Sequence, residues 1–113
     1  ISLGRLMADE TISFRWKEAA KDWVQLNALA DILEECKSAT LSDMMQKYVS
    51  NGDTSVSKAE MLAKSSDEWQ TYIRGMVAAR KDANLAKVKA DWLRMRHSEQ
   101  MSEEANNRAE MKL

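Results

Sequence analysis

The chain contains no proline, and its apolar residues recur at alternating spacings of three and four along two long stretches. Proline interrupts helices more strongly than any other residue, so its absence leaves long helices unobstructed. A three/four alternation places apolar side chains on one face of a helix, in the pattern of a coiled coil. Together these features predict an all-α fold.

One turn cluster divides the 113 residues, which is the length of a single domain. It covers residues 51–56 and combines glycine, asparagine, aspartate and serine, which are typical of turns. We therefore expect a flexible leader at 1–11 and an N-terminal helical arm at 12–50. The turn follows, and residues 57–113 form a C-terminal arm.

Capping signals predict where the helices start. Ser57 and Glu60 form a capping box, and Ser65 and Glu68 form another with acidic residues in its first turn. We expect a short helix from Ser57 and then one very long helix over about 66–110. Residues 37–40 fit a weak break within the N-terminal arm.

The three/four positions form an apolar seam on each arm, and four consecutive positions of the second seam are alanine. Alanine lets helices approach closely but buries little area, so such a helix pair is marginally stable alone. The long helix, about 65 Å, also exceeds the roughly 30–35 Å diameter of a globule of this chain length. We predict a homo-oligomer of coiled-coil-like helical hairpins. Its packing seam comprises Trp16, Trp23, Leu26, Leu33, Tyr72, Met76, Ala83, Ala86, Ala90 and Leu93, and continues through His97 to Met101 and Ala105.

A second apolar line, Leu85, Val88, Trp92 and Met95, lies on an adjacent face of the long helix. Two apolar faces on one helix imply several packing partners. The alternative to an oligomer is a monomeric helix-rich domain with a frayed tail.

The composition offers little catalytic or metal chemistry. The single Cys36 excludes an internal disulfide and suits a reducing compartment. With His97 as the sole histidine, the chain lacks the three or four ligands of a typical zinc site. No glycine-rich phosphate loop or nucleophile elbow is present. We expect a protein without enzymatic activity, cofactor or metal, and no membrane span, because no run of about 18 apolar residues exists.

The charge is asymmetric although the net charge is only −1. Residues 71–98 carry seven basic and two acidic side chains. Such a cluster on a helix could follow a phosphate backbone, although charges beside a seam commonly pair with acidic groups of a neighbouring helix or subunit. The candidate nucleic-acid-binding residues form two lines, the first with Arg80, Lys87 and Arg94 and the second with Lys89 and Arg96.

Two segments, Ser65–Met76 and Glu104–Met111, resemble small all-helical proteins from the early region of temperate lambdoid phages of enteric bacteria. The resemblance covers roughly residues 57–113 and carries no catalytic or binding residues. It implies a bacterial host cytoplasm and favours accessories of DNA transactions or binders of host proteins.

The leading functional hypothesis is therefore a non-enzymatic, oligomeric interaction protein. It would act through contacts with an unknown host or phage protein, as an accessory of phage DNA recombination or host takeover. The second hypothesis is direct nucleic-acid binding through the basic lines. A third is a purely structural scaffold component.

Overall fold

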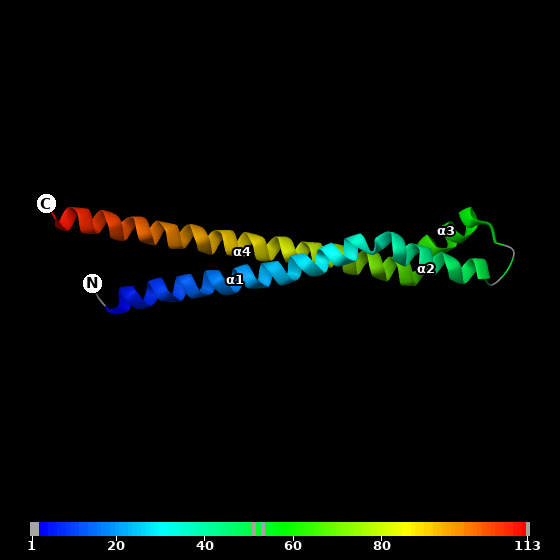
Figure 1. The fold of residues 1–113 in the computed structure, drawn as a ribbon, viewed down its shortest axis with the longest axis horizontal. Helices are drawn as coiled ribbons and strands as arrows, with labels where there is room; N and C mark the ends of the chain where they lie inside the picture. Colours follow the sequence, from blue (N-terminus) through cyan, green and yellow to red (C-terminus); the bar gives the residue numbers. More distant parts are fainter. Residues whose placement is uncertain (1–2, 51, 53, 113) are drawn as a thin grey trace. The chain divides into compact units, whose positions relative to one another are not determined.

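The computed structural model describes the backbone of residues 3–50, 52 and 54–112, and the side chains of the same ranges from residue 11 onward. This part of the chain folds into helices and contains no strand (Figure 1). The prediction of an all-α fold with one very long C-terminal helix is confirmed. The helices are α1 (Leu3–Glu35), α2 (Lys37–Ser50), α3 (Val56–Ser65) and α4 (Asp67–Met111).

The first helix starts earlier than the sequence pattern indicates. Residues 1–11 were expected as a leader, yet α1 is helical from Leu3 onward. The physical reason lies in local propensity, because leucine, arginine, methionine, alanine and glutamate of residues 3–10 all favour helix. Residues 1 and 2 of the expected leader lie outside the described residues.

The expected weak break in the N-terminal arm falls at Cys36, just before residues 37–40. The Cys36 N–H donates to the Ile32 carbonyl at 2.9 Å, and the Thr40 N–H donates to the Cys36 carbonyl at 2.9 Å. Helical hydrogen bonds therefore continue on both sides of this residue. Thr40 lies inside α2, which begins at Lys37.

Serine caps the third and fourth helices, at positions that differ from the predicted boxes. Ser55 is the N-cap of α3, and its hydroxyl accepts the Lys58 N–H at 3.2 Å. The start of the C-terminal arm predicted at Ser57 is thus already inside α3. Ser66 caps α4 by accepting the Trp69 N–H at 3.2 Å, one residue after the predicted Ser65. In both cases the capping serine has an extended backbone, so its hydroxyl oxygen can accept the backbone N–H three residues later. Residues 51 and 53 of the predicted turn lie outside the described residues.

The chain divides into two compact units, each with its own small core. Unit 1 combines residues 1–25 and 83–113, and unit 2 holds residues 26–82. In unit 1, buried Ala19, Ala90 and Leu93 pack together, with Trp16 against them.

The core of unit 2 combines alanine with aromatic and methionine side chains. Buried Met44, Ala63 and Trp69 form its centre, and α2 packs against α3. The Trp69 ring stacks on Tyr72, with 5.7 Å between ring centroids. Half-buried side chains complete the cluster, namely Leu41, Met45, Tyr48, Tyr72 and Ile73.

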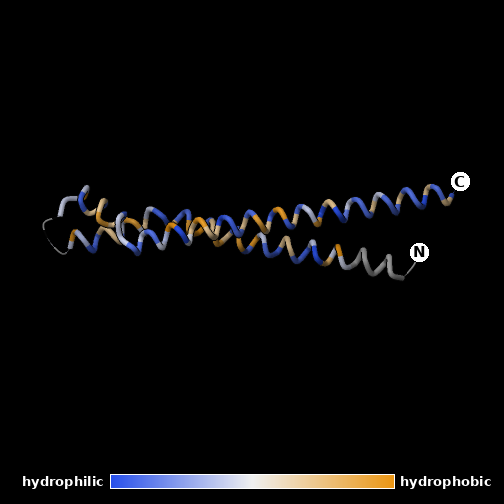
Figure 2. Tube along the Cα trace, turned by 180° about the vertical axis from the view of Figure 1, so that it is seen from behind, coloured by the Kyte–Doolittle hydropathy of each residue, from blue (hydrophilic) through white to orange (hydrophobic). Residues whose placement is uncertain are grey.

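All ten residues predicted for the packing seam are buried or half-buried. The prediction fails only near the end of α4, where Met101 and Ala105 are exposed. After His97 the half-buried positions are Gln100, Glu104 and Asn107, because the three/four alternation continues whether or not the residues are apolar. The C-terminal end of α4 is accordingly mostly hydrophilic (Figure 2).

Replacement of Gly75 by alanine is expected to stabilise the protein. Gly75 lies inside α4, and a Cβ there would meet no other heavy atom within 4 Å. Alanine favours a helix interior over glycine, so Gly75→Ala should raise the free energy of unfolding by about 0.5–1 kcal/mol. Urea denaturation followed by circular dichroism measures the change. The mirror control is Ala78→Gly at an exposed position of the same helix, which should lower stability by a similar amount.

Ala83→Glu tests the buried seam. Ala83 is 0% exposed, so a glutamate would place a carboxylate where alanine alone fits. We expect a loss of at least about 2 kcal/mol in the free energy of unfolding. The control Ala78→Glu, at an exposed site of α4, should leave stability nearly unchanged. Equal melting temperatures for the two variants would contradict the burial of this seam.

Candidate interaction surfaces

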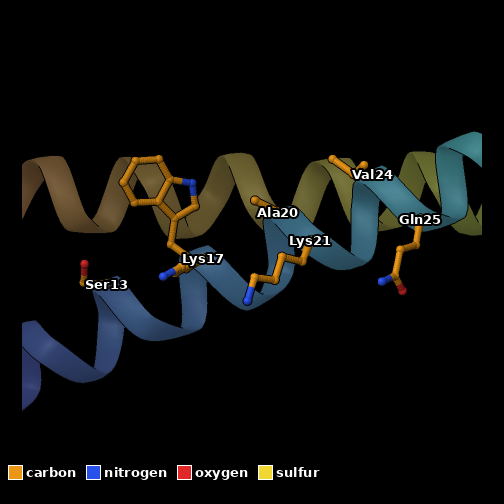
Figure 3. Close-up of a pocket in the computed structure, with 7 residues that line it drawn as sticks. Ser13, Lys17, Ala20, Lys21, Val24 and Gln25 are labelled. Atoms are coloured by element: carbon orange, nitrogen blue, oxygen red, sulfur yellow. The ribbon is translucent and has the colours of Figure 1, made fainter.

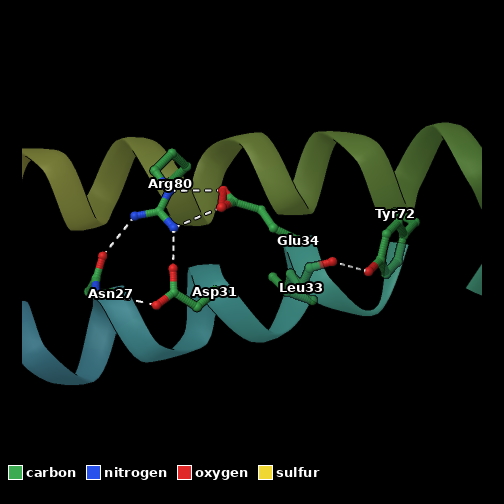
Figure 4. Close-up of polar contacts among 6 residues, drawn as sticks. All are labelled: Asn27, Asp31, Leu33, Glu34, Tyr72 and Arg80. Atoms are coloured by element: carbon green, nitrogen blue, oxygen red, sulfur yellow. Dashed lines mark hydrogen bonds and ion pairs between the residues drawn. The ribbon is translucent and has the colours of Figure 1, made fainter. Parts of the chain in front are cut away.

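One arginine in unit 2 binds three side chains of α1. The Arg80 Nε donates to Glu34 Oε2 at 2.9 Å, and its Nη2 donates to Glu34 Oε1 at 2.8 Å and to Asp31 Oδ1 at 2.7 Å. Its Nη1 donates to Asn27 Oδ1 at 2.7 Å (Figure 4). We call these four residues the Arg80 network. The two bonds to Glu34 form the bidentate pair that suits the planar guanidinium.

The spacing of the acceptors explains why they meet one guanidinium. Asn27, Asp31 and Glu34 follow one another by four and three residues, so they line one face of α1. Asn27 also donates to Asp31 Oδ2 at 3.5 Å, which orients the amide. About two turns before Arg80 on α4, the Tyr72 hydroxyl donates a hydrogen bond to the Leu33 carbonyl (Figure 4).

The Arg80 network shifts the titration of its members. Hydrogen bonds from Arg80, aided by its charge, hold the pKa of Glu34 below the ordinary value of 4.5. The same bond to Glu34, followed by the bond to Asp31, raises the pKa of Arg80. The guanidinium is therefore satisfied by groups of its own chain.

The remaining predicted nucleic-acid-binding residues have weaker contacts. Lys87 Nζ lies 5.9 Å from the centroid of the Trp23 ring, a cation–π distance. Arg94 lies 4.0 Å from Asp91 within α4, in an exposed pair of the kind that contributes little stability. Lys89 is exposed.

Arg96 has two neighbours on its own helix. Its guanidinium carbon lies 5.9 Å from the centroid of the Trp92 ring, and its Nη1 lies 3.5 Å from Glu99 Oε2. Trp92 itself is more than half exposed. Lys89, Trp92 and Arg96 therefore form a small exposed cluster of two cations and one aromatic ring.

The two basic lines do not make one continuous surface. Lys87 and Lys89 are two residues apart, which turns an α-helix by about 200°. Lys87 and Arg94 therefore lie on one flank of α4, and Lys89 and Arg96 lie on the opposite flank. A single straight phosphate backbone cannot follow both flanks at once.

The second apolar line of α4 is exposed to solvent. Leu85, Val88, Trp92 and Met95 are 54–66% exposed. Each of them is two residues from a buried position, such as Met95 from Leu93, and two residues turn an α-helix by about 200°. The line therefore points nearly away from the seam, and the prediction that it lies on an adjacent face is wrong. We call these four residues the outward line. Such a row of large apolar side chains marks an interaction site more often than a random surface does.

A groove of about 680 Å³ runs along α1 in unit 1. Its lining surface is mainly apolar, and Lys17 and Lys21 are among the side chains that line it (Figure 3). Trp16 lines the groove and also contacts His97, with 5.6 Å between ring centroids. The lining residues are Ser13, Trp16, Lys17, Ala20, Lys21, Val24 and Gln25.

Residues that could carry metal or redox chemistry stand apart. Among the side chains that the structure describes, no three of histidine, cysteine, aspartate or glutamate gather as metal ligands. Cys36 is an exposed free thiol at the α1–α2 junction. Within the described residues, no helical stretch combines the length and low charge that crossing a bilayer requires.

No protein-family model, curated protein or solved structure matches the chain.

The partners of Arg80 were missed by the sequence analysis. Pairing of the basic lines with acidic groups of a neighbouring helix or subunit was a general alternative, without Asn27, Asp31 or Glu34 as named partners. A usable signal was present, because these residues share one face of α1 beside the apolar seam.

The Arg80 network should give the protein a measurable acid sensitivity. The folded-state pKa of Glu34 is lowered, so its stabilising effect is present above the unfolded-state pKa, near 4.5, and is lost as pH falls through the folded value. Glu34→Gln should lower the melting temperature at neutral pH, and the difference from wild type should shrink as the solution is acidified below that range. Thermal denaturation across pH measures both. Glu35→Gln, next along α1 and outside the network, serves as the control and should show no such convergence.

Proposed function

We propose that the chain is a non-enzymatic helical interaction protein that docks a partner protein on the outward line. The observation that carries this proposal is the row of Leu85, Val88, Trp92 and Met95, all more than half exposed on one face of α4. Leaving four large apolar side chains in water is unfavourable at about 25 cal/mol for each Å² of apolar surface. Covering them with a helix of a partner recovers this free energy, in the manner of helix recognition through residues spaced by three and four.

The cellular role that we propose is that of an accessory factor of phage DNA recombination or host takeover, acting in the cytoplasm of a bacterial host. The resemblance of residues 57–113 to early-region phage proteins supports this role. A docking surface on a small helical protein is consistent with it, because an accessory factor acts by binding another component. We also propose that the protein works as a homo-oligomer.

Photo-cross-linking from position 92 tests the docking proposal. A photoreactive phenylalanine derivative in place of Trp92 should give discrete protein adducts in bacterial cells, identified by mass spectrometry. The adducts should disappear with Val88→Glu, because a carboxylate on the outward line opposes apolar docking. Val56→Glu is the matched control, since Val56 on α3 is 68% exposed and Val88 is 66% exposed.

Adducts that form equally in the Val88→Glu variant would contradict the proposal. So would a probe at position 92 that yields no more protein adduct than a probe at position 56. Adducts to nucleic acid in place of protein would favour the second candidate function.

Direct nucleic-acid binding remains the second candidate, and the cluster of Lys89, Trp92 and Arg96 favours it. An exposed ring beside two cations combines base stacking with phosphate attraction. If the cluster binds DNA, fluorescence anisotropy should show affinity that falls strongly between about 50 and 200 mM salt. The double variant Lys89→Glu, Arg96→Glu should remove this binding, and the control Lys58→Glu on α3 should not. Salt-independent or absent binding would exclude this candidate.

A further inference from the structure

The outward line is symmetric along α4 when its flanking charges are included. Lys81 stands four residues before Leu85, and Glu99 stands four residues after Met95. The spacings from Lys81 to Glu99 are therefore four, three, four, three and four, which is symmetric about residue 90. All these side chains are exposed. A line with this symmetry is complementary to itself when a second helix runs in the opposite direction.

We infer that a second copy of the chain covers the outward line, with the two α4 helices antiparallel about a two-fold axis at residue 90. This inference rests on the proposed function, because it names the occupant of the same surface. In this dimer Leu85 of one copy faces Met95 of the other, and Val88 faces Trp92.

The sizes of the facing side chains favour the antiparallel direction. Two Val88–Trp92 layers each pair a small residue with a large one, and two Leu85–Met95 layers pair residues of similar size. A parallel pair would place Trp92 against Trp92 and Val88 against Val88. One layer would then be overfilled and the other underfilled, and both errors destabilise packed interfaces.

The charges in the line favour the same direction. An antiparallel pair brings Lys81 of each copy opposite Glu99 of the other, whereas a parallel pair sets like charges face to face. On the flanks, the antiparallel pair would set Lys89 near Lys89 and Asp91 near Asp91 across the axis, and a parallel pair would bring Arg96 near Asp91 of the other copy. Asp91 has Arg94 at 4.0 Å and Glu99 has Arg96 at 3.5 Å on the same helix, and exposed charge contacts on the flanks contribute little in either orientation. The residues in the line itself therefore set the orientation.

The size of the surface indicates a reversible dimer. Four large apolar side chains of each copy form an interface at the small end of the range for specific complexes, which begins at about 1,200 Å². Such interfaces are typical of transient association. We expect a dimer that dissociates on dilution, with a dissociation constant in the micromolar range.

A charge exchange measured by sedimentation equilibrium tests the orientation. Lys81→Glu and Glu99→Lys should each weaken dimerisation by roughly three- to tenfold, because each creates two like-charge contacts. The double variant Lys81→Glu, Glu99→Lys should return the dissociation constant to near the wild-type value. Lys58→Glu on α3 carries the same charge change away from the line and should have no effect.

Cysteine pairing gives an independent test in a Cys36→Ser background, which removes the exposed native thiol. Proteins carrying Lys81→Cys and Glu99→Cys should form disulfide-linked dimers when mixed, and neither should do so alone. In the antiparallel dimer the two copies of position 81 are about 27 Å apart, far beyond the reach of a disulfide. Circular dichroism confirms that each variant is helical.

Each outcome of these tests is decisive. Rescue by the double charge variant, with disulfides from the mixture only, supports the antiparallel dimer. Disulfides from Lys81→Cys alone, or no rescue, would overturn it. A wild-type protein that stays monomeric at millimolar concentration would overturn the second copy as occupant, while adducts to other proteins would sustain the proposed function. Self-association that survives Val88→Glu would overturn the dimer through the outward line, and the cross-linking from position 92 would then decide the proposed function separately.

Discussion

Close packing through alanine is the interaction on which both units depend. Seven of the ten hydrophobic residues buried in the described part of the chain are alanine. A small side chain lets two backbones approach, but it removes little apolar area from water. Apart from the buried Met44, Trp69 and Leu93, the larger apolar side chains lie around these contacts and are half-buried or exposed. A core built in this way leaves much of the apolar surface of the helices outside it, and the outward line is the clearest example.

Helix type and seam positions could be predicted because they depend on periodicity. The spacing of Trp16, Trp23, Ala83 and Leu93 fixes which side of each helix is buried, whatever lies opposite. Helix ends were less predictable, since they depend on which of several nearby serines adopts the extended cap conformation. Ser55 and Ser66 cap the helices, although only Ser57 and Ser65 have the glutamate of a capping box three residues later.

The polar contacts between helices could not be predicted from periodicity. The sequence assigned Arg80 to a basic line because of its charge and its spacing from Lys87. Its hydrogen-bond partners are 46 to 53 residues away in sequence, so no local pattern indicates them. Only the relative register of α1 and α4 in unit 2 brings the guanidinium to Asn27, Asp31 and Glu34. The second apolar line presented the opposite difficulty. Its apolar residues were apparent in the sequence, but periodicity alone does not show whether another helix of the same chain covers them.

The Arg80 network also has an evolutionary consequence. An alanine seam permits two helices to slide by a heptad with little change in packing, whereas a guanidinium with four hydrogen bonds accepts one register. A descendant that lost Arg80 would keep the neighbouring carboxylates of Asp31 and Glu34 on α1 without their cation. Their mutual repulsion would favour further substitutions at positions 31 and 34. Positions 31, 34 and 80 are therefore expected to change together among relatives, while the neighbouring alanines vary only with other small residues.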